Sequence, residues 1–87
     1  MLEITSAAGD YLEAMLKEEN APAGVILRLA LDNSDLEFQL DRQRPGDMVL
    51  THGNRPVLLL DEQLAELVEE NMLAVEDHED GEKLALI

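Results

Sequence analysis

The sequence predicts an α+β domain in which two helices accompany a mainly antiparallel, mixed β-sheet. Apolar residues recur at three- and four-residue intervals near the start of the chain and again after residue 61, whereas the stretches between them alternate apolar and polar side chains. The connections between the alternating stretches are too short for parallel crossovers, which need about a dozen residues or more. We therefore expect consecutive strands to pair as hairpins, within a single domain over residues 1–87.

The first helix is expected over residues 6–19. Either Thr5 or Ser6 can cap its N-terminus, since each hydroxyl can accept a hydrogen bond from a free backbone N–H. The segment Asn20–Gly24 should end the helix, because Pro22 cannot continue it and restricts the residue before it. The apolar stripe of this helix consists of Ala8, Tyr11, Leu12, Met15 and Leu16.

A first hairpin is expected from residues 25–31 and 36–40, which both alternate in hydrophobicity. Asp32, Asn33 and Ser34 join the two strands, and Asp and Asn favour turns because they bond their own backbone and tolerate left-handed geometry. The loop from Asp32 to Asp35 should therefore be a plain, tight turn.

A second hairpin is expected from residues 48–51 and 55–60 about the turn His52–Asn54. Asp61 then stands where an N-cap should be, and a helix within Asp61–Asn71 follows. The apolar stripe of this helix consists of Leu64, Leu67, Val68 and Met72. Two further short strands, 73–75 and 83–87, are expected about Asp80 and Gly81. The expected core includes Leu12, Leu29, Phe38, Leu59 and Leu67.

The charge of the chain excludes several classes of partner. There are 20 acidic and 6 basic residues, which gives a formal net charge of −14, and such a surface repels a phosphate backbone. We expect no nucleic-acid partner, and no membrane partner, because the longest apolar stretches are far too short to cross a bilayer. The chain has no cysteine for disulfides and its start does not resemble a signal peptide, so the cytoplasm is the expected location.

The order of these elements, with their residues, resembles the HesB-like family of A-type iron-sulfur carriers. The resemblance spans nearly the whole chain and is carried by ordered segments. They are Ile4-Thr5 with Ala7-Ala8, Val25–Leu29, Leu36–Leu40, Asp47-Met48-Val49, Gly53, Val57–Asp61 with the helix after it, Leu73–Asp77, and Gly81–Ile87. The resemblance implies a HesB-like fold and a place near iron-sulfur cluster assembly.

The chain departs from this family where members do their chemistry. Members carry one cysteine in a Gly-Cys-Ser-Gly-like loop after the first strand and two more in a C-terminal Cys-Gly-Cys tail. Here the residues Asp32–Asp35 replace the loop, and the sequence stops at Ile87 without such a tail. Iron-sulfur clusters need soft thiolate ligands, whereas Asp, Asn and Ser offer hard oxygen ligands. The resemblance therefore implies a cysteine-less, degenerate member.

Other candidate sites are weak in the sequence. His52 and His78 each stand alone in a turn, without the spacing of a metal site, and we expect solvated residues. The run Glu76–Glu82 resembles half of a calcium loop but has Ile87 where the twelfth-position glutamate belongs, so a hairpin turn is expected instead. Thr51 beside His52 lacks the third member of a triad.

Arginines make most of the positive charge. Arg28, Arg42, Arg44 and Arg55 could form a local basic spot for an anion or a partner, but pairing with the many carboxylates is favoured.

These observations predict no catalytic, metal-binding or cofactor-binding residues, no cofactor and no enzymatic activity. The predicted function is a non-catalytic accessory or binding module that resembles the carriers but lacks their cysteine ligands, with a protein partner or self-association. The alternative is an acidic interaction module that binds a basic partner.

Overall fold

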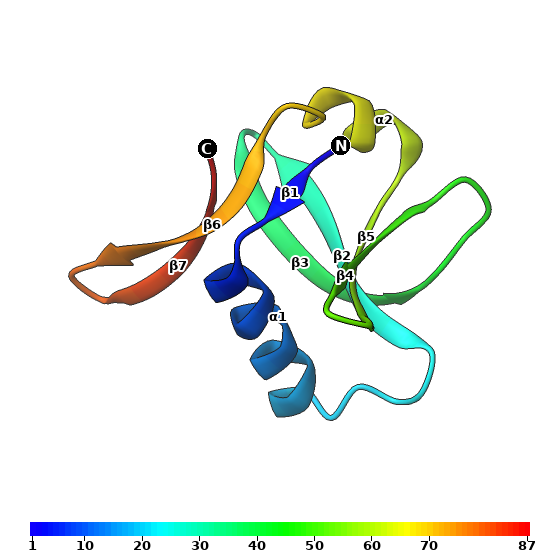
Figure 1. Cartoon of the computed structure of the whole chain (residues 1–87), viewed down its shortest axis with the longest axis horizontal. Helices are drawn as coiled ribbons and strands as arrows, with labels where there is room; N and C mark the ends of the chain where they lie inside the picture. The colour runs from blue at the N-terminus through cyan, green and yellow to red at the C-terminus, as the bar shows by residue number, and fades with distance from the viewer.

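The computed structural model describes all residues from Met1 to Ile87 and contains two helices and seven strands (Figure 1). In chain order the elements are β1 (Glu3–Ile4), α1 (Ser6–Glu18), β2 (Val25–Asp32), β3 (Asp35–Arg42), β4 (Met48–His52), β5 (Arg55–Leu60), α2 (Glu62–Leu67), β6 (Met72–His78) and β7 (Gly81–Leu86). This arrangement confirms the α+β class.

The strands form two sheets. One has the order β3-β2-β5-β4 and the other the order β1-β6-β7. Every pair of strands that is joined by a turn is antiparallel, as expected from the short connections. Two pairs are parallel, β2 with β5 and β1 with β6, and both join strands that are distant in the sequence. A crossover can span two whole hairpins, so short local connections do not exclude parallel pairing.

Helix α1 begins and ends where side-chain chemistry allows it. The Thr5 hydroxyl accepts a hydrogen bond from the backbone N–H of Ala8 at 3.1 Å, so Thr5 rather than Ser6 is the N-cap. After Glu18 the chain turns at Asn20, whose φ of 52° is left-handed and stops the helix. The helix contacts strands of both sheets and buries Leu12 completely between them.

Helix α2 is shorter than its apolar pattern suggested. Asp61 caps it, accepting from the backbone N–H of Leu64 at 2.8 Å, but the helix ends at Leu67 and Met72 already belongs to β6. A six-residue helix docks through one narrow stripe, and here the buried residues are Leu64 in the helix and its C-cap residue Val68. Leu67 lies off that stripe and is 70% exposed, so its assignment to the core was wrong.

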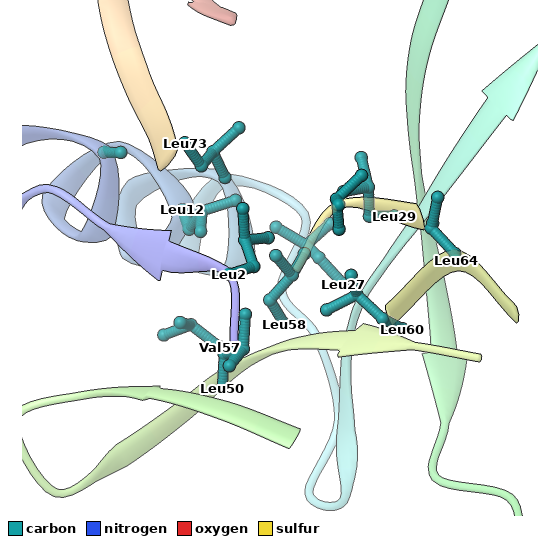
Figure 2. Packing of buried hydrophobic residues seen from close by; sticks show 12 residues of the cluster. Leu2, Leu12, Leu27, Leu29, Leu50, Val57, Leu58, Leu60, Leu64 and Leu73 are labelled. Atoms are coloured by element: carbon teal, nitrogen blue, oxygen red, sulfur yellow. The ribbon is translucent and has the colours of Figure 1, made fainter. Parts of the chain in front are cut away.

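The core is aliphatic and draws on both sheets and both helices. In Figure 2 the side chains of Leu2, Leu12 and Leu73 approach those of Leu27 and Leu58. All four residues from Val57 to Leu60 are fully buried, as a continuous apolar run in a central strand requires. Leu12, Leu29 and Leu59 are buried as predicted, whereas Phe38 is half-buried and packs on the edge of the core.

Neither helix has the length and apolar character needed to cross a membrane.

Candidate functional site

The connection between β2 and β3 is where the carrier resemblance places the first cysteine loop. Asp32 and Asp35 are direct cross-strand partners, so Asn33 and Ser34 alone form the loop. Both have positive φ, 51° and 72°, which is the backbone of a two-residue type I′ turn. The expected plain turn is confirmed.

The two aspartates of this turn lie opposite one another and are exposed. Neither Asp32 nor Asp35 makes an ion pair, and like charges directly opposite in a ladder are unfavourable. No third ligating side chain joins them, and nowhere in the chain do three or more His, Asp or Glu residues gather as a metal site would require.

A cluster of charged side chains fixes the far end of the same hairpin. Arg28 on β2 donates from Nε to Asp41 Oδ2 at 2.7 Å and from Nη1 to Asp47 Oδ1 at 3.0 Å. Arg44 donates its backbone N–H to Asp47 Oδ2 at 2.7 Å and its guanidinium to Asp41 Oδ2 at 2.7 Å. The side chains of Arg28 and Asp47 are only 11% and 4% exposed, so this cluster holds the loop between β3 and β4 against the sheet.

The electrostatics of the cluster follow from its hydrogen bonds. Bonding to the Arg28 guanidinium is the main cause that holds the pKa of Asp41 and of Asp47 below the ordinary value for aspartate. In return, the hydrogen bond to Asp47 is the main cause that raises the pKa of Arg28. All three groups are charged at neutral pH, so the cluster is a structural ion network.

The four arginines differ in whether they pair with carboxylates. The favoured pairing of arginines with carboxylates is confirmed for Arg28 and Arg44, but Arg42 donates to the carbonyl of Ala23 at 3.3 Å and Arg55 makes no ion pair. The arginines therefore do not gather into an anion site.

His52 is not the solvated turn residue that the sequence suggested. It ends β4, its side chain is 25% exposed, and its Nε2 lies 2.9 Å from Asp10 Oδ1. Its ring lies so close to Gly9 of α1 that a Cβ at that position would collide with it. The histidine thereby joins β4 to the helix, a packing role. Thr51 precedes it in the strand and points to the opposite face, so the two cannot act together.

The acidic run Glu76–Glu82 forms the end of the β6–β7 hairpin, as expected. Figure 1 shows this hairpin extending away from the rest of the fold. His78 and Gly81 close its ladder, and the side chain of His78 is 44% exposed, with Nε2 3.4 Å from Glu76 Oε1. His78 is the solvated residue that was predicted.

The surface carries several open depressions, with volumes from about 310 to about 570 Å³. One of about 480 Å³ lies between the N-terminus and α2, where Met1, Met48 and Ala65 face four carboxylates. Another, of about 310 Å³, lies between β2 and α2 and includes Leu31 and Leu67. Neither holds a nucleophile beside a base.

Known proteins show what this arrangement is similar to. No family model and no curated protein matches the sequence. Among solved structures, SufA of Escherichia coli, described as involved in biosynthesis of iron-sulfur clusters, matches with a TM-score of 0.73 at 14% identity, over 99% of this chain and 83% of its own. A structure of IscA with the [2Fe-2S] cluster matches with a TM-score of 0.65 at 18% identity, over 100% of this chain and 84% of its own.

The chain has the fold of SufA and IscA. The HesB-like fold expected from the ordered sequence segments is thereby confirmed, and the likeness extends over the entire described chain. This sequence carries the fold without a single cysteine.

Two features of the site were missed in the sequence. The contact of His52 with Gly9 joins residues of different elements, yet a glycine inside a helical pattern is itself a signal of close approach by a neighbour. The pairing of Arg28 with Asp47 has no local signal, since acidic residues are too numerous for spacing to single one out.

Proposed function

We propose that this chain is a non-catalytic accessory or binding module on the scaffold of the A-type iron-sulfur carriers, and that it holds no cluster through thiolates. One observation carries the proposal: the fold of SufA is present over 99% of the chain, while the chain contains no cysteine. A retained scaffold without thiolates is suited to contacts with other proteins.

The ligand chemistry supports the part of the proposal that excludes a thiolate-held cluster. Clusters of this kind are held by several convergent thiolates, and the carboxylates, amide and hydroxyl of Asp32–Asp35 are hard oxygen and nitrogen groups. The two-residue turn at Asn33 and Ser34 also leaves no loop length from which ligands can converge on one point.

The likeness to carrier proteins supports the non-catalytic half, because SufA and IscA are described by their part in cluster biosynthesis and by a bound cluster. The proposed partner is a protein, and the proposed location is the cytoplasm.

The alternative function is an acidic interaction module for a basic partner, favoured by the formal charge of −14. A salt titration of binding separates the two. Charge-driven binding weakens steeply as ionic strength rises, whereas binding through surface shape persists.

Anaerobic reconstitution with ferrous iron and sulfide, followed by visible absorbance after desalting, tests the proposal. IscA serves as the positive control. The expected spectrum of this chain lacks the charge-transfer bands of a cluster, and a stable, stoichiometric cluster would refute the proposal because it requires ligands that this chain does not supply.

A further inference from the structure

Strand β3 is an open edge of its sheet. It is the terminal strand in the order β3-β2-β5-β4, and only β2 packs along its length. It is also long for an edge, with eight residues paired to β2 without a bulge. An edge of this kind presents unpaired backbone groups to any strand that approaches.

The ladder determines which backbone groups are free. In a two-residue hairpin the closing pair, here Asp32 and Asp35, exchanges both backbone hydrogen bonds, and hydrogen-bonded pairs recur at every second residue, so the backbone groups of Arg28 point toward β3. Arg28 lies opposite Gln39, and every second residue of β2 pairs with β3 in the same way. The residues of β3 whose backbone N–H and C=O groups bond β2 are therefore Asp35, Glu37, Gln39 and Asp41. The N–H and C=O groups of Leu36, Phe38 and Leu40 point outward.

The two faces of strand β3 carry different kinds of side chain. Leu36 and Phe38 point to the inner face and pack partly on the core, and Leu40 beside them is 39% exposed. On the outer face near the turn, Asp35 and Glu37 are exposed carboxylates without an ion-pair partner. Asp32 on the adjacent strand adds a third. A strand added here would meet an apolar row on one face and a negative row on the other.

A second copy of this chain is a poor occupant. An antiparallel pairing of two β3 strands centred on Phe38 would match Leu36 with Leu40, but it would also set Asp35 of one copy opposite Asp41 of the other. Each copy further carries a formal charge of −14. Acidic side chains on an edge are a known means of preventing self-pairing, and the same charges attract a cationic strand.

We propose that the β3 edge binds an extended segment of a basic protein by strand addition, which rests on the proposed function of a binding module. The outward backbone groups of Leu36, Phe38 and Leu40 supply the main-chain hydrogen bonds. Apolar side chains of the segment lie beside those residues, and its alternate lysines or arginines lie beside Asp35 and Glu37.

A blocked peptide of the sequence Val-Lys-Val-Lys-Val-Lys-Val is the probe, and Val-Glu-Val-Glu-Val-Glu-Val is its control. Titration of the full chain, followed by amide hydrogen exchange, is expected to show binding of the lysine peptide alone. Exchange at Leu36, Phe38 and Leu40 should slow, because the added strand accepts from those N–H groups.

Two matched pairs of variants locate the site. Leu40→Pro removes one outward N–H without touching the ladder to β2 and should weaken peptide binding roughly fivefold. Leu40→Val keeps the N–H and should bind the peptide like the natural chain.

The second pair tests the charge of the edge. Glu37→Lys should weaken peptide binding roughly tenfold at low salt. Glu79→Lys, at the end of the β6–β7 hairpin, makes the same change of net charge and should have a much smaller effect.

The outcomes are distinct. If the peptide protected other amides instead, the edge site would be wrong while a binding role remained. The same would follow if Glu37→Lys and Glu79→Lys weakened peptide binding equally. Absence of binding at millimolar peptide would overturn the edge site as well. Self-association that protects the same three amides would replace the basic segment with a second copy. A cluster found on reconstitution would instead refute the proposed function, whatever the peptide does.

Discussion

The guanidinium of Arg28 meets the Asp47 carboxylate through two nitrogens, Nη1 and Nη2, each bonded to a different oxygen. Arg28 lies in the middle of β2 and Asp47 lies immediately before β4, so this two-point contact joins the loop between the hairpins to the sheet. Bidentate pairs of this kind add geometric specificity to their charge. The four-stranded sheet is thereby fixed at the end opposite the turn at Asn33 and Ser34.

Loss of the Asp47 charge should destabilise the fold. Asp47→Asn keeps the size of the side chain but weakens its bonds to Arg28 and to the Arg44 backbone, and we expect a loss of roughly 1–3 kcal/mol in the free energy of unfolding. Urea unfolding measures it. Asp77→Asn, on the exposed end of β6, is the control and should change stability little.

The same pair predicts a pH dependence. Because Arg28 lowers the folded-state pKa of Asp47, the stabilisation is fully present above the pKa of the unfolded carboxyl and is lost as pH falls through the lower, folded value. The stability difference between the natural chain and Asp47→Asn should stay constant from neutral pH to about pH 5 and shrink below about pH 4. A difference that grew on acidification would contradict this account of the pair.

Gly9→Ala should destabilise the protein although alanine favours helices. The added Cβ collides with the His52 ring, and overpacking of this kind costs about 1–3 kcal/mol. In a His52→Ala background the collision is absent, and the same substitution should become stabilising by up to about 1 kcal/mol through helix propensity. Thermal unfolding of the double-mutant cycle checks this. Equal effects in both backgrounds would show that the ring does not contact Gly9.

Ser34→Gly should stabilise the hairpin. Ser34 has a φ of 72°, where a side chain is strained, and relief of that strain should exceed the entropy cost of glycine, for a gain of roughly 0.5–1 kcal/mol. Ser34→Ala retains the strain and should stay within about 0.5 kcal/mol of the natural chain. If glycine instead lowered the unfolding midpoint, the turn would not be of the type I′ form.

These turn and helix features differ in how far the sequence predicts them. Two features depend only on residues that are neighbours in the sequence, so the local pattern is sufficient to predict them. They are the turn at Asn33 and Ser34 and the helix cap at Asp61. Strand β1 was missed because two residues carry no periodicity, and its pairing with β6 depends on contacts with distant residues such as Leu73. The exposure of Leu67 likewise depends on where α2 docks, which no local pattern contains.

Added salt should stabilise the protein. The formal charge of −14 makes the folded chain repel itself, and screening weakens that repulsion. The melting temperature is therefore expected to rise between low and moderate sodium chloride. No change, or a fall, would mean that the carboxylates are spread too widely to interact.

The proposed function requires that this scaffold holds no iron-sulfur cluster, and that one thiol introduced into the turn does not change this. Ser34→Cys places a thiol at the tip of the β2–β3 hairpin, yet a cluster needs several convergent thiolates. The decisive measurement is iron and acid-labile sulfide analysis after anaerobic reconstitution, for the natural chain and for Ser34→Cys. We expect that neither protein retains a stoichiometric cluster, and a full complement of cluster per chain or per dimer in either protein would refute the proposed function.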